Sequence, residues 1–217
     1  MHRLDSNLAR CLRNPAAAIC VTNSARFGAT RPSAYAYREG VSTDVDVRAW
    51  LRQCGTETIE HPGGTLYAHL CRVQGRLANL GYGVDVQSAG LTHAAYGTDG
   101  FDLALLDWKN RATLRDLVGE AAEALVYLYG ACDRKRTWQG LQTTGEVTDR
   151  FTGQVIWLDA DQLKPFIDLS IVNELDVIEQ DPALLYKHGE YFRELFRSWA
   201  PAMSAPLIEQ IRHTIGR

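Results

Sequence analysis

The stretch TLYAHLCRVQGRLANL, residues 65–80, decides the fold class of this chain. Its apolar residues recur at spacings of four, three, four and three: Leu66, Leu70, Val73, Leu77 and Leu80. This spacing is the period of one apolar stripe on an amphipathic helix. Gly81 follows directly, and glycine is a common residue just past the end of a helix. The stretch therefore predicts a helix that packs into a helical core.

The chain after residue 44 carries further helical patterns. Helices are predicted from Asp44 or Asp46 to Cys54, and over 85–95, 114–132, 161–180, 186–200 and from about Pro206 onward. Residues 145–158, GEVTDRFTGQVIWL, place β-branched and aromatic residues on both sides of Thr152-Gly153, which predicts a short β-hairpin. We therefore expect an all-α fold with one short inserted β-hairpin, in which residues 45–217 form a helical domain.

Residues 1–44 are predicted to differ from the rest. Leu4, Leu8 and Leu12 have helical spacing over residues 3–13, and Asn14-Pro15 ends that helix. The segment from Thr22 to Asp44 has no sustained period and is much longer than an ordinary connection. It is interpreted either as an active-site lid or as a mobile connection. The chain is expected to be a single domain overall.

Composition excludes several classes of partner. The 23 basic and 26 acidic side chains are interspersed, the net charge is −3, and no basic block is present to bind a nucleic-acid backbone. No window approaches 18 consecutive apolar residues, so no membrane contact is expected. The protein is predicted to be soluble and cytoplasmic. Its five cysteines lack a C-x-x-C pair and are expected to be reduced thiols.

Three histidines, His61, His69 and His93, are the first candidates for a site. His69 borders the apolar stripe of the helix over 65–80, and His93 shares a face with Val86 and Ala89 on the next predicted helix. Both side chains are therefore expected to point inward, where a neutral imidazole can bind a divalent cation. His61 lies in the turn EHPGGT and can approach the same site from outside the helix. The alternative for each is a hydrogen-bonded core or loop histidine.

The turn after His93 supplies polar groups. Asp99 follows the flexible Gly97, so its carboxylate is a candidate metal ligand or general base. Tyr96 and Thr98 are candidate hydrogen-bonding partners for a substrate oxygen. Packing and helix capping are the alternatives for these residues.

The spacing from His61 to Leu70, H-x-x-x-x-x-x-x-H-L, followed by AGLTHAAYGTD at residues 89–99, is similar to an uncharacterised family of domains inside the HD superfamily. TLYAHL and AGLTHA also resemble the start of the HD domain of alarmone synthetase/hydrolases, in which two histidines and an aspartate bind one metal. DRFTGQ and IVNELD fit the same uncharacterised family, so the resemblance covers roughly residues 57–180. It implies an HD-domain-like helical bundle with a metal on His69 and His93.

The sequence also departs from that pattern. Ala94 stands where the superfamily has its name-giving aspartate, which argues against a two-metal site. Either Asp99 substitutes for it or metal binding has been lost.

The last ligand of the superfamily is an aspartate on a later helix. Asp168 and Glu174 are the candidates here. Glu174 falls on an apolar stripe, so its carboxylate requires a cation, a metal or a set of hydrogen bonds.

Three functions follow from the resemblance. The first is a metal-dependent hydrolase that acts on a small phosphorylated or ester-type substrate through a metal-activated water, with one divalent ion (manganese, iron or another) as cofactor. The second is a mononuclear non-haem iron oxygenase. The third is a non-catalytic binding or scaffold domain. The hydrolase is favoured because hydrolysis is the commonest chemistry in the superfamily.

Overall fold

The computed structural model describes residues 44–101 and 103–216. The helix predicted over 3–13 and the loop up to residue 43 lie outside the described residues. The elements follow one another in this order: α2 Asp44–Gln53, β1 Glu60–His61, β2 Gly64–Thr65, α3 Leu66–Asn79, α4 Val84–Thr92, α5 Arg111–Val118, α6 Glu120–Ala131, α7 Arg134–Thr137, α8 Leu141–Thr144, β3 Glu146–Thr148, β4 Val155–Trp157, α9 Ala160–Gln180, α10 Pro182–Trp199, the 3₁₀ helix η4 Ala200–Ala202 and α11 Ala205–Ile215. The prediction of an all-α fold with a small inserted hairpin is confirmed.

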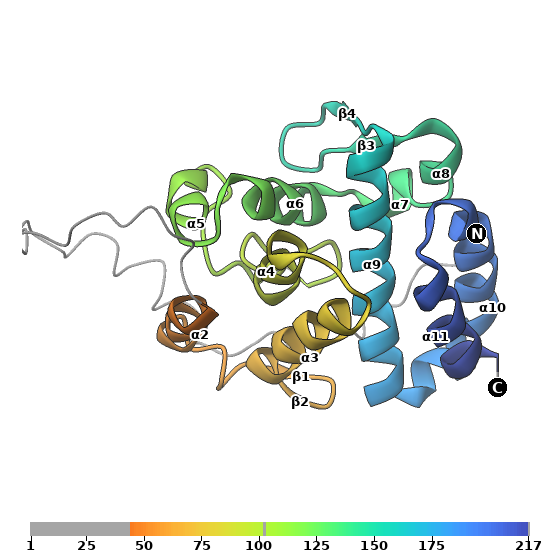
Figure 1. Ribbon diagram of the computed structural model, residues 1–217, viewed down its shortest axis with the longest axis horizontal. Helices are drawn as coiled ribbons and strands as arrows, with labels where there is room; N and C mark the ends of the chain where they lie inside the picture. Colours follow the sequence, from red (N-terminus) through yellow and green to blue (C-terminus); the bar gives the residue numbers. More distant parts are fainter. Residues whose placement is uncertain (1–43, 102, 217) are drawn as a thin grey trace, which may run out of the picture.

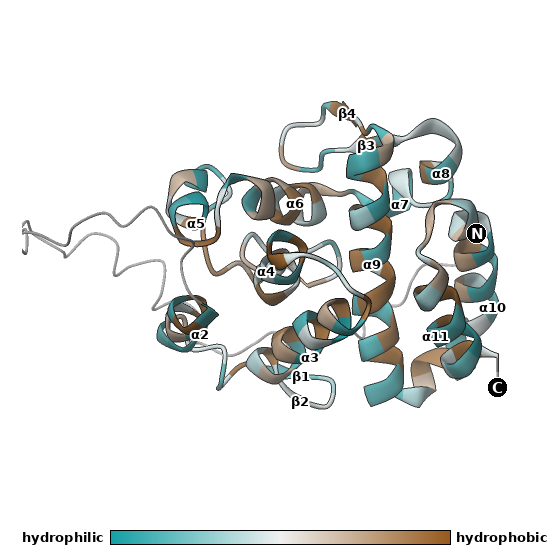
Figure 2. Cartoon of the chain, in the orientation of Figure 1, coloured by the Kyte–Doolittle hydropathy of each residue, from teal (hydrophilic) through white to brown (hydrophobic). Residues whose placement is uncertain are grey.

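Helix α9 stands in the middle of the molecule. Figure 1 shows α3, α4 and α6 on one side of it and α10 and α11 on the other. A helix covered on both sides must be apolar around most of its circumference. From Phe166 to Ile178 nearly every residue of α9 is buried, and Figure 2 shows apolar colouring along its central turns. This helix therefore belongs to the interior and does not carry a single buried stripe.

The hydrophobic core has two parts, and α3 and α6 contribute residues to both. One part joins α9, α10 and α11 to the C-terminal half of α3, which contributes Val73 and Leu77. The other joins α2, α4, α5 and α6 to the N-terminal half of α3, which contributes Leu66 and Leu70. The apolar stripe predicted over 65–80 therefore serves both parts of the core.

The helix predicted over 114–132 is wrong in one respect, because it is two helices. Gly119 separates α5 from α6 with φ of 87° and ψ of 163°. That conformation is available almost only to glycine. A period of apolar residues that continues across a glycine does not reveal such a break.

Two smaller features also differ from prediction. Helix α4 begins at Val84 with Gly83 as its N-cap, not with Asp85. A second hairpin precedes α3, in which Glu60 pairs with Thr65 and His61 with Gly64. The predicted hairpin is present as β3 and β4, with Val147 opposite Ile156.

Within 44–101 and 103–216, no helix combines the length and the apolar character that crossing a membrane requires.

Candidate functional site

His69 and His93 meet in the interior, where α3, α4 and α9 converge. Their side chains are 1% and 2% exposed, and their Nε2 atoms lie 3.3 Å apart. The close packing of α4 on α3 permits this meeting. A Cβ atom added at Gly90 would overlap the end of the Leu77 side chain of α3, which would then have to shift.

The Nδ1 atoms of both histidines are already engaged. His93 Nδ1 lies 2.7 Å from the carbonyl oxygen of Gly90, and His69 Nδ1 lies 2.7 Å from Asp176 Oδ2. A carbonyl oxygen can only accept a hydrogen bond, so Nδ1 of His93 carries the proton. Burial, and then the proximity of His69, lower the pKa of His93 to about 3. His93 is therefore neutral near pH 7, and its Nε2 presents a lone pair to His69.

Asp176 is an ionised carboxylate that orients His69. Burial by itself raises its pKa, but hydrogen bonds from His69 and Arg72 outweigh that effect and lower the pKa to about 2. Arg72 donates through Nε to Oδ1 at 2.7 Å and through Nη2 to Oδ2 at 2.9 Å. The same guanidinium reaches the carbonyl oxygen of Pro62 at 3.2 Å. Arg72 therefore links the β1–β2 hairpin to the carboxylate behind His69.

Asn173 of α9 completes the group. Its Oδ1 lies 3.0 Å from His69 Nε2, and its Nδ2 donates to Glu174 Oε1 at 3.0 Å. That second bond fixes the orientation of the amide, so that the oxygen faces the histidine. His69 Nε2 thus lies between two acceptors, the oxygen of Asn173 and the lone pair of His93. A hydrogen-bond donor or a cation placed between these atoms would satisfy both acceptors.

The two Nε2 atoms are spaced as two ligands of one cation would be. Nitrogens that bind a metal at about 2.0–2.1 Å in a tetrahedral shell lie about 3.3 Å apart. Metal-binding histidines almost always donate their other N–H to a carboxylate or a backbone carbonyl, as His69 and His93 do here. Among the described residues, no group of three or more His, Cys, Asp or Glu side chains is placed to hold a metal ion. The third donor here would be the amide oxygen of Asn173.

His61 lies over this group on the outer side. Its ring stacks on that of His69, with centroids 4.1 Å apart and 25° between the planes. Burial, and then the proximity of His69, lower the pKa of His61 to about 4. Its Nδ1 is shielded from solvent and has no hydrogen-bond partner. Strand β1 thus brings the third predicted histidine to the site. Its contact with His69 is ring stacking and not a hydrogen bond between ring nitrogens.

Glu174 lies beside the site and is balanced by Arg134. Arg134 Nη1 donates to Glu174 Oε1 at 2.8 Å, and Nη2 donates to the hydroxyl of Tyr129 at 2.7 Å. Tyr129 packs edge-on against His93, with ring centroids 5.2 Å apart. The expected need of Glu174 for a cation is therefore met by an arginine. Its contribution to the centre is indirect, through the amide of Asn173.

Asp99 lies on the other side of Arg134. Its Oδ2 accepts a hydrogen bond of 2.9 Å from the backbone N–H of Arg134, the first residue of α7. The carboxylate therefore satisfies a helix N-terminus. It takes no position between the two histidines, where it was considered as a replacement for the aspartate lost at Ala94.

Asp168, Tyr96 and Thr98 are not brought to the histidines. Asp168 accepts hydrogen bonds from Tyr82 and Lys164 and lies nearer the N-terminal end of α9 than Asn173. Its separation of five residues from Asn173 amounts to about 7.5 Å along a helix. The Asp168 carboxylate is therefore engaged away from the two histidines.

Tyr96 and Thr98 serve the surrounding structure. The hydroxyl of Tyr96 donates to Glu123 Oε1 at 2.9 Å, within a separate ion pair between Glu123 and Arg111. Thr98 pairs with Phe101 through the backbone and closes the turn after α4. These contacts belong to the turn after α4 and to the neighbouring ion pair, and the substrate contact expected for both residues stays a prediction.

The sequence pattern did not lead us to expect that the Asn173 amide oxygen contacts His69 Nε2, or that Asp176 is the carboxylate that contacts His69 Nδ1. A usable signal was present in DLSIVNELDVI, residues 168–178, where polar residues interrupt a helix that is apolar on every side. Buried polar side chains need partners, so each interruption predicted a contact in the interior.

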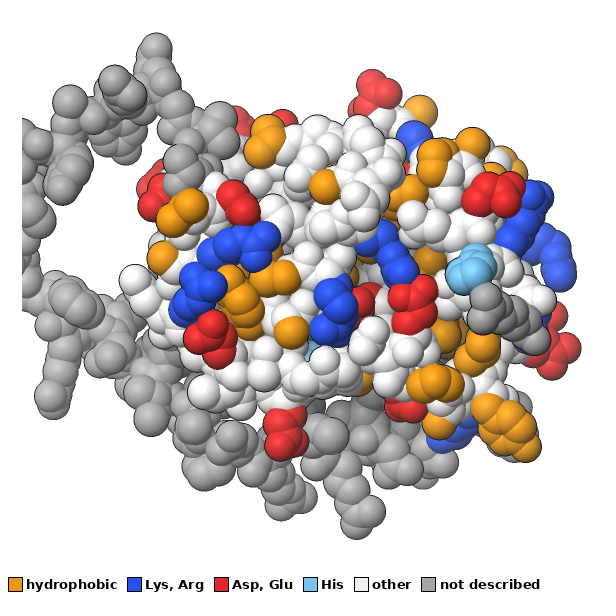
Figure 3. Space-filling view, turned by 60° about the horizontal axis from the view of Figure 1, so that its bottom comes forward, with side chains coloured by type: hydrophobic (Ala, Val, Ile, Leu, Met, Phe, Trp, Pro, Cys, Tyr) orange, Lys and Arg blue, Asp and Glu red, His pale blue; other side chains and the backbone are white. Residues whose placement is uncertain are grey.

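The surface near the site carries charges of both signs. Figure 3, which turns the lower side of Figure 1 forward, shows arginine and lysine side chains next to aspartate and glutamate. Arg72 and Arg76 on this side are paired with Asp176 and Glu179. A cleft dominated by one sign of charge would favour an ionic substrate, and these pairs do not form one.

The fold and the site together define a helical domain with a buried centre of two histidines and an amide, supported by carboxylates. A family described as a domain of unknown function (DUF6817) matches residues 50–134. The match includes His61, His69 and His93 and ends at Arg134, before the helix that carries Asn173 and Asp176. Comparison with curated proteins and with solved structures gives no match.

Proposed function

We propose that this chain is an HD-like metal-dependent hydrolase whose single divalent cation is held by His69, His93 and Asn173. The observation that carries the proposal is the pair of Nε2 atoms 3.3 Å apart, with both Nδ1 atoms engaged in hydrogen bonds. The resemblance of residues 57–180 to HD-type domains supports it independently. Asn173 would take the place of the aspartate that such domains have on a later helix.

The chain's own residues would hold the donors in position. Asp176 fixes His69, the Gly90 carbonyl fixes His93, and Glu174 fixes the Asn173 amide. When bound, a divalent cation supplies Lewis acidity, which polarises a substrate oxygen and lowers the pKa of a bound water. Three protein donors leave coordination positions open, as in catalytic sites.

The charges around the centre favour an ester-type substrate over a phosphorylated one. In the described part of the chain, Arg72 and Arg134 contact residues of the centre, and both are engaged by carboxylates, Asp176 and Glu174. A phosphate dianion would have to compete with those carboxylates. A neutral ester would need only polarisation of its carbonyl oxygen.

A non-catalytic binding or scaffold domain is the second candidate. A second proton on His69 would also satisfy the two acceptors beside it, and the burial of both histidines restricts access. The iron oxygenase is less favoured. The usual ferrous site has two histidines and a carboxylate, whereas the third donor here is the amide of Asn173.

Metal binding is the first test. Protein reconstituted anaerobically with Mn²⁺, Fe²⁺ or Zn²⁺ should retain about one ion per chain, and its unfolding temperature should rise, because a ligand of the folded state stabilises it. His93→Ala should abolish both effects. His188→Ala, which removes a histidine of α10 outside the cluster, should abolish neither. Equal metal retention by the wild type and His93→Ala would contradict the proposed site.

A carboxylate at residue 173 provides a sharper test of the third donor. Asn173→Asp should bind the ion more tightly than the wild type, because it adds an anionic oxygen ligand, and Asn173→Leu should bind it more weakly. If Asn173 were only a packing residue, both variants would bind the ion as the wild type does.

Turnover separates the hydrolase from the scaffold. The reconstituted protein should release p-nitrophenol from p-nitrophenyl acetate faster than from p-nitrophenyl phosphate, and the rate should fall to background in His93→Ala. One bound ion per chain with no turnover of either compound would support the non-catalytic candidate.

A further inference from the structure

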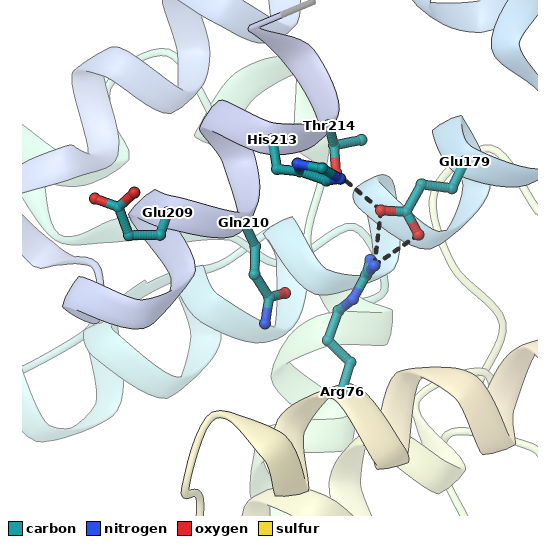
Figure 4. Close-up of a pocket in the computed structure, with 6 residues that line it drawn as sticks. All are labelled: Arg76, Glu179, Glu209, Gln210, His213 and Thr214. Atoms are coloured by element: carbon teal, nitrogen blue, oxygen red, sulfur yellow. Dashed lines mark hydrogen bonds and ion pairs between the residues drawn. The ribbon is translucent and has the colours of Figure 1, made fainter.

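A hollow of about 280 Å³ opens between α3, α9 and α11. It is lined by Arg76, Glu179, Glu209, Gln210, His213 and Thr214. Figure 4 shows Arg76 rising from α3 toward Glu179, with Gln210 extending from α11 on the other side of the guanidinium. The hollow lies on the same α3–α9 seam as the histidine centre, beyond Arg72 and Asp176. None of its lining residues belongs to that centre.

One wall of the hollow is fixed by an ion pair. Arg76 Nη2 donates to Glu179 Oε1 at 2.7 Å and to Oε2 at 2.6 Å. The hydroxyl of Thr214 donates to the same Oε1 at 2.8 Å. The acceptor oxygens of Glu179 are thus engaged from α3 and from α11. The Arg76 side chain is held in place while part of its guanidinium remains unused.

Two polar atoms of these lining residues have no partner. Among the described residues, four side-chain nitrogen or oxygen atoms are shielded from solvent and make no hydrogen bond, and Arg76 Nη1 and Gln210 Oε1 are two of them. One is a donor and the other an acceptor. Buried polar groups are rarely left unpaired in folded proteins. A group in the hollow that both accepts and donates a hydrogen bond could satisfy the two atoms together.

Hydrogen bonding, charge and size together restrict the kind of molecule that could bind in the hollow. A hydroxyl accepts one hydrogen bond and donates another, so it suits Arg76 Nη1 and Gln210 Oε1 together. An anion is disfavoured, because Glu179 neutralises Arg76 and Glu209 adds a further carboxylate, which Arg212 partly offsets. The volume is close to the lower limit of about 300 Å³ for small-molecule sites. The occupant is therefore small and neutral.

We propose that this hollow binds a small neutral polyhydroxylated molecule, a sugar or a polyol, through Arg76 and Gln210. One ligand hydroxyl accepts from Arg76 Nη1 and donates to Gln210 Oε1, after a small rotation of either side chain toward the hollow. The site is independent of the metal proposed above, so the two can be tested separately.

Nuclear magnetic resonance of the full ¹⁵N-labelled chain tests this directly. D-Ribose, D-glucose and glycerol serve as probes, and gluconate is the anionic control. With at least one neutral probe, the Arg76 Nε–H signal and the Gln210 side-chain amide should shift and saturate at millimolar concentration. Gluconate should bind at least tenfold more weakly. Shifts that grow linearly over the whole surface would overturn the proposal, since they indicate a general cosolute effect.

Matched variants localise the effect. Gln210→Met removes the acceptor at similar size, and Arg76→Lys keeps a positive charge for Glu179 but loses Nη1. Each should weaken binding at least tenfold, whereas Gln139→Met, at an exposed position outside the hollow, should leave it unchanged. Unaltered affinity in both Gln210→Met and Arg76→Lys would overturn the proposal. So would a crystal structure at saturating sugar that shows only water between the two atoms.

Discussion

His69 and Asp176 lie 107 positions apart in the sequence, yet their side chains are joined by a 2.7 Å contact. The sequence indicated that His69 faces inward, because it borders the stripe of α3. It did not indicate the partner, because the choice among Asp168, Glu174 and Asp176 depends on the rotation of α9 about its axis. That rotation is set by packing on two sides of α9 at once. A prediction of one buried apolar stripe on this helix does not determine it.

Replacing Asp176 should show how much the carboxylate contributes to both stability and metal binding. Asp176→Asn leaves Arg72 and His69 without their charged acceptor, so the free energy of unfolding should fall by about 2–3 kcal/mol. Metal affinity should also fall, about 10–100-fold, because a carboxylate that orients a histidine ligand has been lost. Urea unfolding and metal titration measure the two effects.

The exposed pair of Glu209 and Arg212 is the control for that experiment. Glu209→Gln also removes one carboxylate, but from a pair whose side chains are about 70% exposed. Exposed ion pairs contribute about 0–1 kcal/mol, and metal affinity should not change. If Asp176→Asn were no more harmful than Glu209→Gln, the buried carboxylate would have no special role.

Cys132 should be inert in the folded protein. Burial raises the pKa of its thiol to about 12, and the thiolate is the reactive form. Iodoacetamide at pH 8 should therefore leave Cys132 unmodified in native protein and modify it in urea, as peptide mass spectrometry can establish. Modification of Cys132 at the same rate with and without urea would show that this part of the core opens readily.

At the scale of elements, local patterns predicted the helices better than their boundaries. Helix α3 and the β3–β4 hairpin were predicted because stripe spacing and turn residues are local signals. The break between α5 and α6 was not, because Gly119 departs from helical geometry in a way that the apolar period of residues 114–132 does not reveal. The β1–β2 hairpin was missed because each of its strands has only two residues.

Two glycine substitutions should have opposite effects on stability. Gly119→Ala forces a side chain into a conformation with φ of 87°, so the free energy of unfolding should fall by about 1–3 kcal/mol. Gly75→Ala lies inside α3 with open space around its Cβ position, so stability should rise by about 0.5–1 kcal/mol. Thermal unfolding of both variants measures the difference. A stabilising Gly119→Ala would mean that α5 and α6 can merge into one helix.

At the scale of the whole molecule, α9 connects the histidine centre to the C-terminal helices. The histidine centre takes Asn173 and Asp176 from α9, while other faces of the same helix pack against α10 and α11. The sequence predicted the all-α class but not this central position, because the order of helices along the chain does not specify which one is enclosed. The metal centre proposed at the α3–α4–α9 junction therefore depends on helices that are distant from it.

A change in the C-terminal helices should consequently loosen the centre. Trp199 is 1% exposed, and its indole N–H donates to the carbonyl oxygen of Trp138 at 3.1 Å. Trp199→Ala should lower the free energy of unfolding by about 3–5 kcal/mol, because it leaves a large cavity. Hydrogen exchange should register the loss at α10 and equally at the amides of Leu91 to Ala95, provided that the whole molecule opens as one unit. If exchange accelerated in α10 and α11 alone, α9 would not transmit stability from the C-terminal helices to the histidine centre, and those helices would be a separate folding unit.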